Sequence, residues 1–443
     1  MKKNKKNSKG NSGQKLYRKA KKIIPGGNML LSKRPEMFAP DIWPSYFSKA
    51  KGINVWDLDG NKFTDFSIMG IGTNILGYGR KEVDEAVMQT IRSGNLSTLN
   101  CPEEVELAEK LVEINPWSSR VRFARTGGEA NSIAIRIARA ATNRDKVAVC
   151  GYHGWHDWYL SANIAKDSAL DGHLLPGLST SGVPRKLEGL TVPFKYGDID
   201  SIAKLIKSEQ FAAVKMEVAR STKPDKEFLE EIRKLTKKHG TVLIFDECTS
   251  GFRECYGGLH RKVNVEPDMA MFGKTLGNGY AITCVIGSDD IMSACENSFI
   301  SSTFWTERIG PTAAIKTLEI MKQEKPWIFM NQQASKVRKN LSKIAKKNNL
   351  EITIGGLPVL TNFSINHPDW LKIKTYITQE ALKHKMLISN SFYISALHTD
   401  EELDKYYQFI ELIFRDISNH LDNDNFCGRL EGPHCHEGFQ RLN

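Results

Sequence analysis

The sequence has no apolar run that approaches the roughly 18 residues of a membrane-spanning helix. Its basic start also lacks the apolar core of a signal peptide. Its eight cysteines show no Cys-x-x-Cys spacing, so they predict free thiols in a reducing compartment and argue against a disulfide framework. These absences argue against a membrane protein and predict a cytoplasmic location.

Acidic residues are missing from residues 1–15, which contain six lysines. Because these lysines account for more than half of the net charge of +11, the basic excess belongs mainly to a disordered arm. No aromatic residues lie between the lysines, so a nucleic-acid partner is not expected. The remaining composition is typical of a globular protein, and 443 residues are too many for a single core, which predicts two domains.

Short apolar runs alternate with amphipathic helical patterns along the middle of the chain. One such helix is predicted over residues 226–239 and ends at Gly240. Continuous apolar runs are typical of strands that are covered on both faces. The pattern predicts an α/β fold with a mostly parallel sheet and a ligand at the carboxyl ends of its strands. The predicted strands are 121–125, 146–151, 211–217, 241–246, 268–273 and 282–287.

Two of these strands lead into residues of complementary chemistry, Asp246 and Lys274. A pyridine aldehyde cofactor such as pyridoxal 5′-phosphate (PLP) needs an amine that forms an imine and an acid that keeps its ring nitrogen protonated. We expect Lys274 to form this Schiff base and to move a proton on the substrate, with Asp246 against the ring nitrogen. On these two residues alone, a capping or magnesium-binding acid and a solvated lysine would be equally good interpretations.

The surrounding segments resemble the class III PLP-dependent aminotransferases of fold type I, in the branch of glutamate-1-semialdehyde 2,1-aminomutase. The resemblance rests on Phe245–Arg253 and Met271–Gly279 and runs from about Leu16 to about Tyr407. It implies a large PLP-binding domain and a smaller α+β domain made from the N- and C-terminal parts. A hairpin is predicted over residues 52–66 of the N-terminal part. The expected boundaries are a basic arm at 1–15, the small domain at 16–75 and 322–425, the large domain at 76–321, and an extension at 426–443 that packs on a dimer surface.

The resemblance also implies contacts to the phosphate of the cofactor. Gly127 and Gly128 lie in a loop that opens a helix, where backbone N–H groups and the helix dipole meet an anion. The family usually has Ser or Thr at the position of Gly128, so a hydroxyl contact is expected to be lost here. A threonine is expected to reach the phosphate of the neighbouring subunit, which implies a homodimer with shared sites. Counting back from Pro311 selects Thr306, and a gap would select Thr303.

Further cofactor contacts are implied around the ring. Tyr152 and Cys248 are expected on its opposite faces, where stacking fixes the ring plane, and His153 is included among the cofactor-binding residues. His153 and His156 have a spacing that occurs in metal sites, but no third ligand follows at a recognisable spacing, so no metal is expected. Glu217 resembles an acid of the family, but we leave it out of the catalytic set.

The substrate is the least specified feature. Arg253 and Arg34 are candidates for binding a substrate carboxylate, and each could equally form a surface ion pair. Segments 153–195 and 388–395 depart from the aminomutase pattern. The sequence therefore predicts a ping-pong aminotransferase that uses a small-molecule amino donor, such as glutamate, and an oxo-acceptor. The alternative is intramolecular amino transfer by a glutamate-1-semialdehyde aminomutase.

Overall fold

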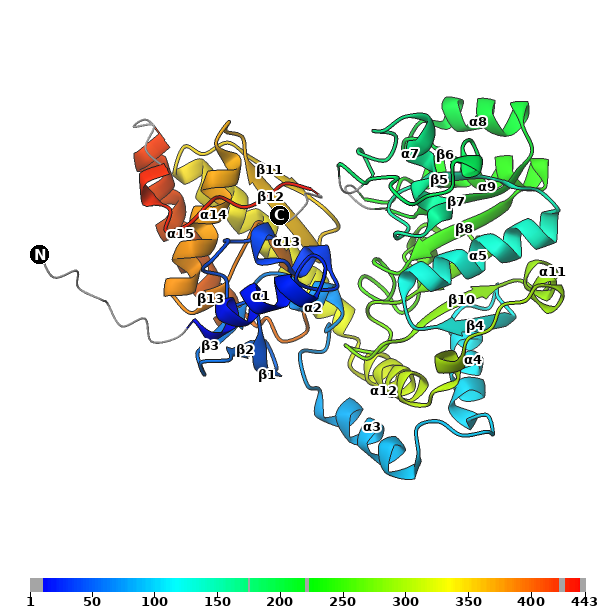
Figure 1. Ribbon diagram of the computed structural model, residues 1–443, viewed down its shortest axis with the longest axis horizontal. Coiled ribbons are helices and arrows are strands. Elements are labelled where there is room, and N and C mark those ends of the chain that lie inside the picture. Colours follow the sequence, from blue (N-terminus) through cyan, green and yellow to red (C-terminus); the bar gives the residue numbers. More distant parts are fainter. Residues whose placement is uncertain (1–10, 174–175, 220–222, 422–426, 439–443) are drawn as a thin grey trace, which may run out of the picture. The chain divides into compact units, whose positions relative to one another are not determined.

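The computed structural model describes residues 11–173, 176–219, 223–421 and 427–438. The chain divides into two compact units (Figure 1). The larger unit consists of residues 72–76 and 80–332, and the smaller unit contains the remaining N- and C-terminal parts together with Gly77–Gly79. Within the described ranges, no helix combines the length and the apolar character needed to cross a lipid bilayer.

A seven-stranded sheet in the order β4-β10-β9-β8-β7-β5-β6 forms the centre of the larger unit. β8 (Val242–Glu247) lies between β7 (Phe211–Glu217) and β9 (Met269–Phe272), and both pairings are parallel. β10 (Thr283–Gly287) is antiparallel to both of its neighbours, so the predicted mostly parallel sheet of an α/β fold is confirmed. The other strands are β4 (Arg120–Ala124), β5 (Lys146–Cys150) and β6 (Thr191–Pro193).

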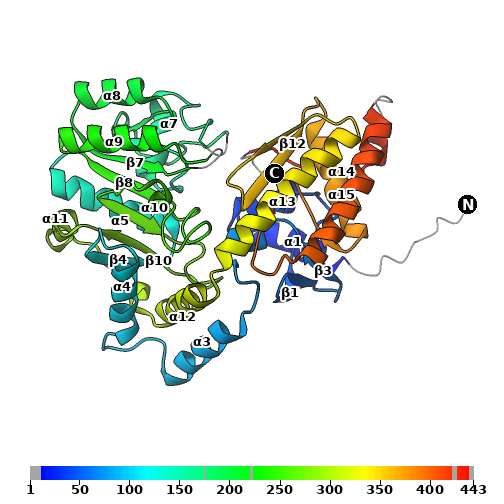
Figure 2. The same ribbon diagram turned by 180° about the vertical axis from the view of Figure 1, so that it is seen from behind.

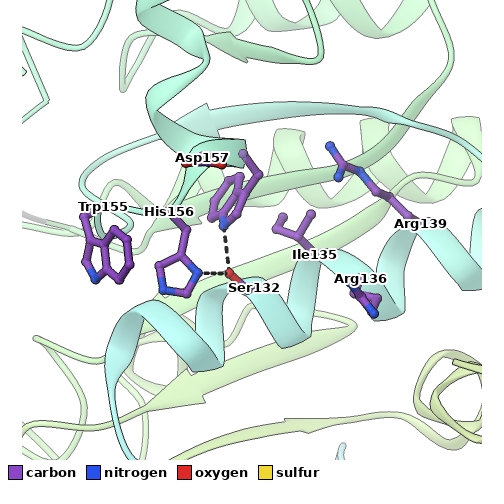
Figure 3. Close-up of a pocket in the computed structure, with 8 residues that line it drawn as sticks. Ser132, Ile135, Arg136, Arg139, Trp155, His156 and Asp157 are labelled. Carbon is purple, nitrogen blue, oxygen red and sulfur yellow. Dashed lines mark hydrogen bonds between the residues drawn. The ribbon is translucent and has the colours of Figure 1, made fainter. Parts of the chain in front are cut away.

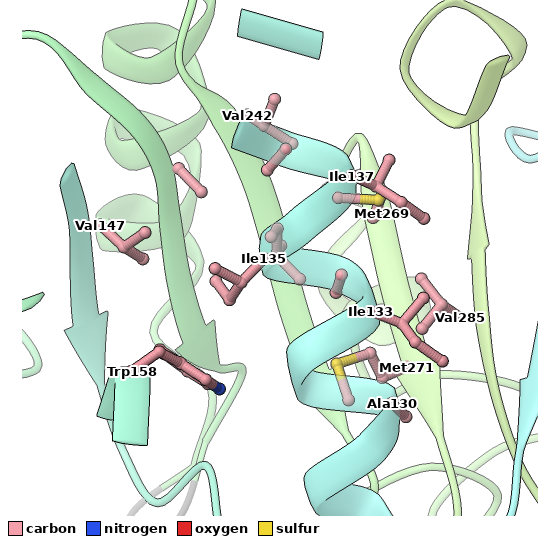
Figure 4. Packing of buried hydrophobic residues seen from close by; sticks show 14 of the residues in the cluster. Ala130, Ile133, Ile135, Ile137, Val147, Trp158, Val242, Met269, Met271 and Val285 are labelled. Atoms are coloured by element: carbon pink, nitrogen blue, oxygen red, sulfur yellow. The ribbon is translucent and has the colours of Figure 1, made fainter. Parts of the chain in front are cut away.

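Helix α5 (Gly127–Thr142) covers one face of this sheet. It begins with a capping box, in which Thr126 accepts the N–H of Glu129 and the Glu129 carboxylate accepts the N–H of Thr126. Its apolar side chains pack against those of the central strands in one continuous core (Figure 4). This core includes Ile133, Ile135, Ile137, Val242, Met269, Met271 and Val285.

The predicted helix over 226–239 is α9 (Lys226–His239). It begins at Asp225, whose carboxylate accepts the N–H of Phe228, and ends at Gly240 in a left-handed conformation with φ of +60°. α9 and α5 lie on opposite faces of the sheet (Figures 1 and 2). Other helices of this unit are α3 (Lys81–Ser93), α4 (Pro102–Ile114), α6 (Asp157–Leu160), α7 (Ala162–Ala165), α8 (Ile199–Ser208), α10 (His260–Val263), α11 (Asp289–Met292) and α12 (Ile309–Glu324).

The smaller unit contains two sheets, β1-β2-β3-β13 and β11-β12-β14. The predicted hairpin over 52–66 is formed by β2 and β3, and the Asp57 carboxylate accepts the N–H groups of Asp59 and Asn61 in its turn. The strands are β1 (Phe47–Lys51), β2 (Asn54–Asp57), β3 (Lys62–Asp65), β11 (Ile352–Gly355), β12 (Leu360–Ile365), β13 (Met386–Leu387) and β14 (Ser391–Tyr393). The helices are α1 (Ser12–Ile23), α14 (Trp370–Lys383) and α15 (Asp400–Leu421), while α13 (Pro326–Lys347) begins in the larger unit.

Both ends of the described chain are held by contacts within the smaller unit. Helix α1 begins at Ser12, within the stretch expected to be disordered, because the backbone N–H of Ser12 donates to the Asp59 carboxylate at 3.0 Å. Residues 1–10 lie outside the described residues. Near the C-terminus, the N–H of Cys435 donates to Thr375 at 2.8 Å, so this part of the extension packs on α14 of its own unit.

Candidate active site

Asp246 lies at the carboxyl end of the central strand β8, and its side chain is buried. Its Oδ2 accepts a hydrogen bond from Nδ1 of His153 at 2.8 Å and lies 3.5 Å from Nζ of Lys215. Its Oδ1 accepts the N–H of Cys248 at 3.1 Å. Burial by itself raises the pKa of a carboxyl group, but these partners outweigh it and hold the pKa of Asp246 well below its ordinary value. Asp246 is therefore an ionised carboxylate inside the protein.

His153 is fully buried and supports Asp246. Its Nε2 lies 3.2 Å from the carbonyl oxygen of Cys150, so both ring nitrogens face oxygen atoms that only accept. Of the two contacts, the one to Asp246 is the shorter, so Nδ1 is the donor that supports the carboxylate. The second histidine of the His-x-x-His pair, His156, has a different partner, because its Nδ1 lies 2.5 Å from Oγ of Ser132. The two rings therefore belong to separate networks.

Lys215, on β7, completes the charged group around Asp246, and the sequence analysis missed it. Its side chain has no exposed surface, and its Nζ lies 2.9 Å from Sδ of Met271 as well as close to Asp246. Burial lowers the pKa of Lys215, and the Asp246 carboxylate opposes that shift. A lysine inside the apolar run 211–217 was the available signal.

Lys274 follows β9, the strand next to β8. The pairing places Met271 opposite Asp246, so the chain leading to Lys274 leaves the sheet at the same edge as Asp246. The Lys274 ammonium donates to Oγ1 of Thr249 at 2.7 Å, and its backbone N–H donates to the carbonyl of Cys248 at 3.1 Å. The structure thus brings the predicted acid and amine to neighbouring strand ends.

Cys248 lies between this edge and the start of α5. Its Sγ is 3.8 Å from the point that a Cβ on Gly127 would occupy and 3.2 Å from the corresponding point on Gly273. Burial and the negative charge of Asp246 raise the pKa of the Cys248 thiol well above its ordinary value, so the group is neutral. The thiol therefore offers a small apolar surface beside the N-terminus of α5.

Tyr152 follows β5 at the same edge and is half-buried. Its backbone N–H donates to the Glu217 carboxylate at 3.1 Å. The same carboxylate lies 2.4 Å from the point that a Cβ on Gly151 would occupy, where φ is +107°, so only glycine fits before Tyr152. Glu217 is thus a buried support for this turn, which agrees with its omission from the catalytic set.

The two candidate threonines lie in one short 3₁₀ helix, Thr303–Thr306, and both are exposed. The Thr306 hydroxyl donates to the carbonyl of Thr303 at 2.8 Å. Nearby, the Arg125 guanidinium donates to the carbonyls of Trp305 and Glu307, both at 2.9 Å, which ties this segment to the loop before α5. The choice between Thr303 and Thr306 stays a prediction.

The two candidate arginines have structural partners. Arg253 is buried, and its guanidinium donates to the carbonyls of Thr249 and Gly72, both at 2.5 Å. Arg34 lies in the smaller unit and packs on Gly26, where a Cβ would come within 2.3 Å of its Nη2. Backbone carbonyls thus engage Nε and Nη2 of Arg253, and the binding of a substrate carboxylate by Arg253 or Arg34 stays a prediction.

Comparison with known proteins identifies relatives over most of the chain. The sequence model of the family described as aminotransferase class-III matches residues 39–392. A 3-aminobutyryl-CoA aminotransferase of Cloacimonas acidaminovorans is 30% identical over 403 residues, which cover 88% of this chain and 93% of the relative. A glutamate-1-semialdehyde 2,1-aminomutase of Sulfurisphaera tokodaii is also 30% identical, over 80% of this chain and 84% of the relative.

Solved structures with the same fold include the PLP internal aldimine form of the FumI protein from Sphingopyxis sp. MTA144. It is 23% identical, with a TM-score of 0.83 over 94% of this chain and 98% of that one. An omega-transaminase from Sphaerobacter thermophilus is also 23% identical, with a TM-score of 0.78 over 92% of this chain and 98% of that one. These likenesses show the fold-type I architecture of PLP-dependent transaminases.

Proposed function

Because the chain belongs to the class III aminotransferases, a family of PLP-dependent enzymes, we propose that Lys274 is its catalytic amine and Asp246 the partner of the cofactor's ring nitrogen. The observation that carries this proposal is an ionised, buried carboxylate on β8 with an amine just beyond the neighbouring strand. When bound, the cofactor supplies a ring that withdraws electrons from a substrate carbon. A carboxylate at the ring nitrogen keeps that nitrogen protonated.

The described residues fit such a cofactor. The N–H groups of Gly127 and Gly128 open α5 and have no carbonyl partner within the helix, so they can bind the phosphate. The neutral Cys248 thiol and the half-buried Tyr152 offer apolar surface to the ring. Lys274, whose Nζ is held by the Thr249 hydroxyl, would transfer the proton at the substrate carbon.

The reaction that we infer is ping-pong transfer of an amino group from a small-molecule donor, such as glutamate, to an oxo-acceptor. The 3-aminobutyryl-CoA aminotransferase among the relatives supports intermolecular transfer. The second candidate is intramolecular transfer, and the equally similar glutamate-1-semialdehyde 2,1-aminomutase favours it. Location in the cytoplasm stays a prediction from the sequence.

We also infer that the enzyme is a homodimer, in which Thr306 of one subunit reaches the phosphate bound by the other. Large exposed apolar side chains support this inference: Phe299 is 86% exposed, Phe304 69% and Leu99 82%. The carbonyl of Phe299 accepts a hydrogen bond from Arg136 of α5 at 3.0 Å, so Phe299 lies beside this helix. Large apolar side chains that are exposed on a subunit are often covered in an interface.

Replacement of Lys274 tests the site. We expect Lys274→Ala to bind PLP but to lose the absorption band that depends on a lysine linkage, and to lose transamination. Lys262→Ala is the matched control, because Lys262 lies in the same unit and its side chain, which pairs with Glu254, is 47% exposed. An unchanged spectrum in Lys274→Ala would refute the assignment.

Addition of amino donors one at a time to the PLP-loaded wild type separates the two reactions. A glutamate-dependent aminotransferase should release one equivalent of 2-oxoglutarate per site and change its absorption before any acceptor is added. An aminomutase should convert glutamate-1-semialdehyde without a separate donor. Conversion without a donor, together with no response to any donor, would replace the aminotransferase proposal with the second candidate.

A further inference from the structure

Ring nitrogens occupy the space beside Gly128. A Cβ added to Gly128 would lie 3.0 Å from Nε2 of His156, 3.2 Å from its Cδ2 and 3.6 Å from Nε1 of Trp155. These three nearest atoms are all side-chain atoms, and φ at Gly128 is not in the left-handed region. The backbone conformation therefore does not require glycine here; the histidine ring takes the place that a side chain would need.

A hydrogen-bond network orients the His156 ring. Nε1 of Trp158 donates to Oγ of Ser132 at 3.2 Å, and this Oγ lies 2.5 Å from Nδ1 of His156 (Figure 3). Because an indole N–H only donates, Ser132 accepts from Trp158 and can give its own proton to Nδ1. Burial lowers the pKa of His156, which favours the neutral ring, and a neutral ring whose Nδ1 accepts from Ser132 carries its proton on Nε2. The network therefore presents an N–H donor toward Gly128.

The same place lies at the N-terminus of a 16-residue helix. The capping side chain of Thr126 accepts the N–H of Glu129. The N–H groups of Gly127 and Gly128 lie in the first turn of α5, where the helix has no carbonyl four residues earlier to accept them. The helix dipole adds positive potential at this end. Backbone donors from the helix and a side-chain donor from the loop before α6 thus converge on one small region.

We propose that Nε2 of His156 donates a hydrogen bond to the phosphate of PLP, and that the missing side chain of Gly128 makes room for this donor. The inference rests on the proposed PLP site and adds a cofactor-binding residue to it. Ser132 is a positioning residue, because it acts through the orientation of His156. Phosphate recognition by this enzyme then combines two backbone N–H groups with an imidazole N–H.

A comparison of PLP with pyridoxal, which lacks the phosphate, tests the contact. The apoenzyme is titrated with each ligand, and the dissociation constants are obtained from the absorption change. For His156→Ala we expect PLP binding to weaken about tenfold, as for the loss of one hydrogen bond to a charged group, with pyridoxal binding unchanged. Equal weakening for both ligands, or none for PLP, would overturn the proposal.

A compensating pair of substitutions keeps the test independent of misfolding. In Gly128→Ser, the new Cβ would lie 3.0 Å from Nε2, so the ring must move away by a few tenths of an ångström; its contact with the phosphate should weaken, and PLP affinity should fall severalfold. In Gly128→Ser/His156→Ala the serine hydroxyl can donate to the phosphate, so affinity should recover to within about threefold of the wild type. A double variant at least as weak as the product of the two single losses would contradict a shared phosphate site.

The outcome for His156 is separable from that for Lys274. If Lys274→Ala keeps the wild-type spectrum, the proposed function fails whatever His156 does. Suppose that Lys274→Ala behaves as expected, while His156→Ala changes the dissociation constants of PLP and pyridoxal by the same factor. Only the phosphate contact is then refuted. Ser132→Ala should reproduce the loss seen in His156→Ala in weaker form and should have no further effect in the His156→Ala background, since it acts through that ring.

Discussion

The larger and smaller units each contain a histidine without any exposed surface, and the two are held in opposite ways. His153, in the larger unit, faces two acceptors, the Asp246 carboxylate and the carbonyl of Cys150. His398, in the smaller unit, accepts the N–H of Ser395 at 3.0 Å on Nδ1 and donates from Nε2 to the carbonyl of Asp65 at 2.9 Å. The first ring lies against an ionised carboxylate, and the second has one accepting and one donating nitrogen, as a neutral ring does.

The two histidines thus belong to different surroundings: one supports a buried charged group, and the other lies among neutral partners. A buried charge is costly unless it is paired, so the Asp246 carboxylate is tolerated because Lys215 and His153 lie against it. The surroundings of His398 instead lower its pKa to about 4, mainly through burial, so that it stays neutral near pH 7. The larger unit therefore keeps fixed charges where the cofactor chemistry is proposed, and the smaller unit avoids them at His398.

The largest effect is expected when the shared anion is removed. Asp246→Asn should lower the free energy of unfolding of the apoprotein by about 3–5 kcal/mol, because it leaves the buried Lys215 without its counter-charge. Urea denaturation at pH 7 measures this loss. Asp289→Asn is the control: its side chain pairs with Arg120 but is 62% exposed, so its loss should stay under about 1 kcal/mol. Equal losses in the two variants would refute the charged centre.

The neutral histidine predicts an acid-sensitive smaller unit. Because the folded pKa of His398 is about 4, below its ordinary 6.5, the unfolded chain binds the proton first as the pH falls. Stability should thus be complete above pH 6.5 and decline by about 1.4 kcal/mol per pH unit between 6.5 and 4. Unfolding free energies across this range should have a smaller slope in His398→Gln, whereas His434→Gln, at an exposed position, should keep the wild-type slope. Identical slopes in all three proteins would exclude His398 as the source.

The sequence specified the sheet better than the surroundings of the site. The run 211–217 coincides with β7, because an uninterrupted apolar segment between helical patterns is typical of a buried strand. The reversed direction of β10 was not predictable, since a short apolar run has the same composition in either direction. Asp246 and Lys274 could be selected because the cofactor chemistry needs an acid and an amine after neighbouring strands.

The rest of the site depends on contacts between distant parts of the sequence. His156 meets Gly128 only after β5 and α5 pack together, so no local pattern relates the two residues. Arg253 was a candidate for a substrate carboxylate because of its charge, and only the fold shows that its Nε and Nη2 donate to backbone carbonyls. Lys215 interrupts an apolar strand, and a buried ammonium needs a partner; that local anomaly could have led from the sequence to Asp246.

The smallest effect is expected at Lys215, and it tests how the charges are shared. In Lys215→Met the Asp246 carboxylate keeps His153 and the N–H of Cys248, so the loss in unfolding free energy at pH 7 should be about 1–2 kcal/mol, well below that of Asp246→Asn. Asp246→Asn/Lys215→Met should be more stable than Asp246→Asn alone, because it removes a buried ammonium that has lost its counter-ion. Urea denaturation of the four apoproteins gives the coupling. If the double variant gained nothing over Asp246→Asn, Lys215 would not depend on Asp246 for its charge, and His153 alone would balance the carboxylate. If Lys215→Met were instead as costly as Asp246→Asn, Lys215 and not His153 would be the main partner of the carboxylate.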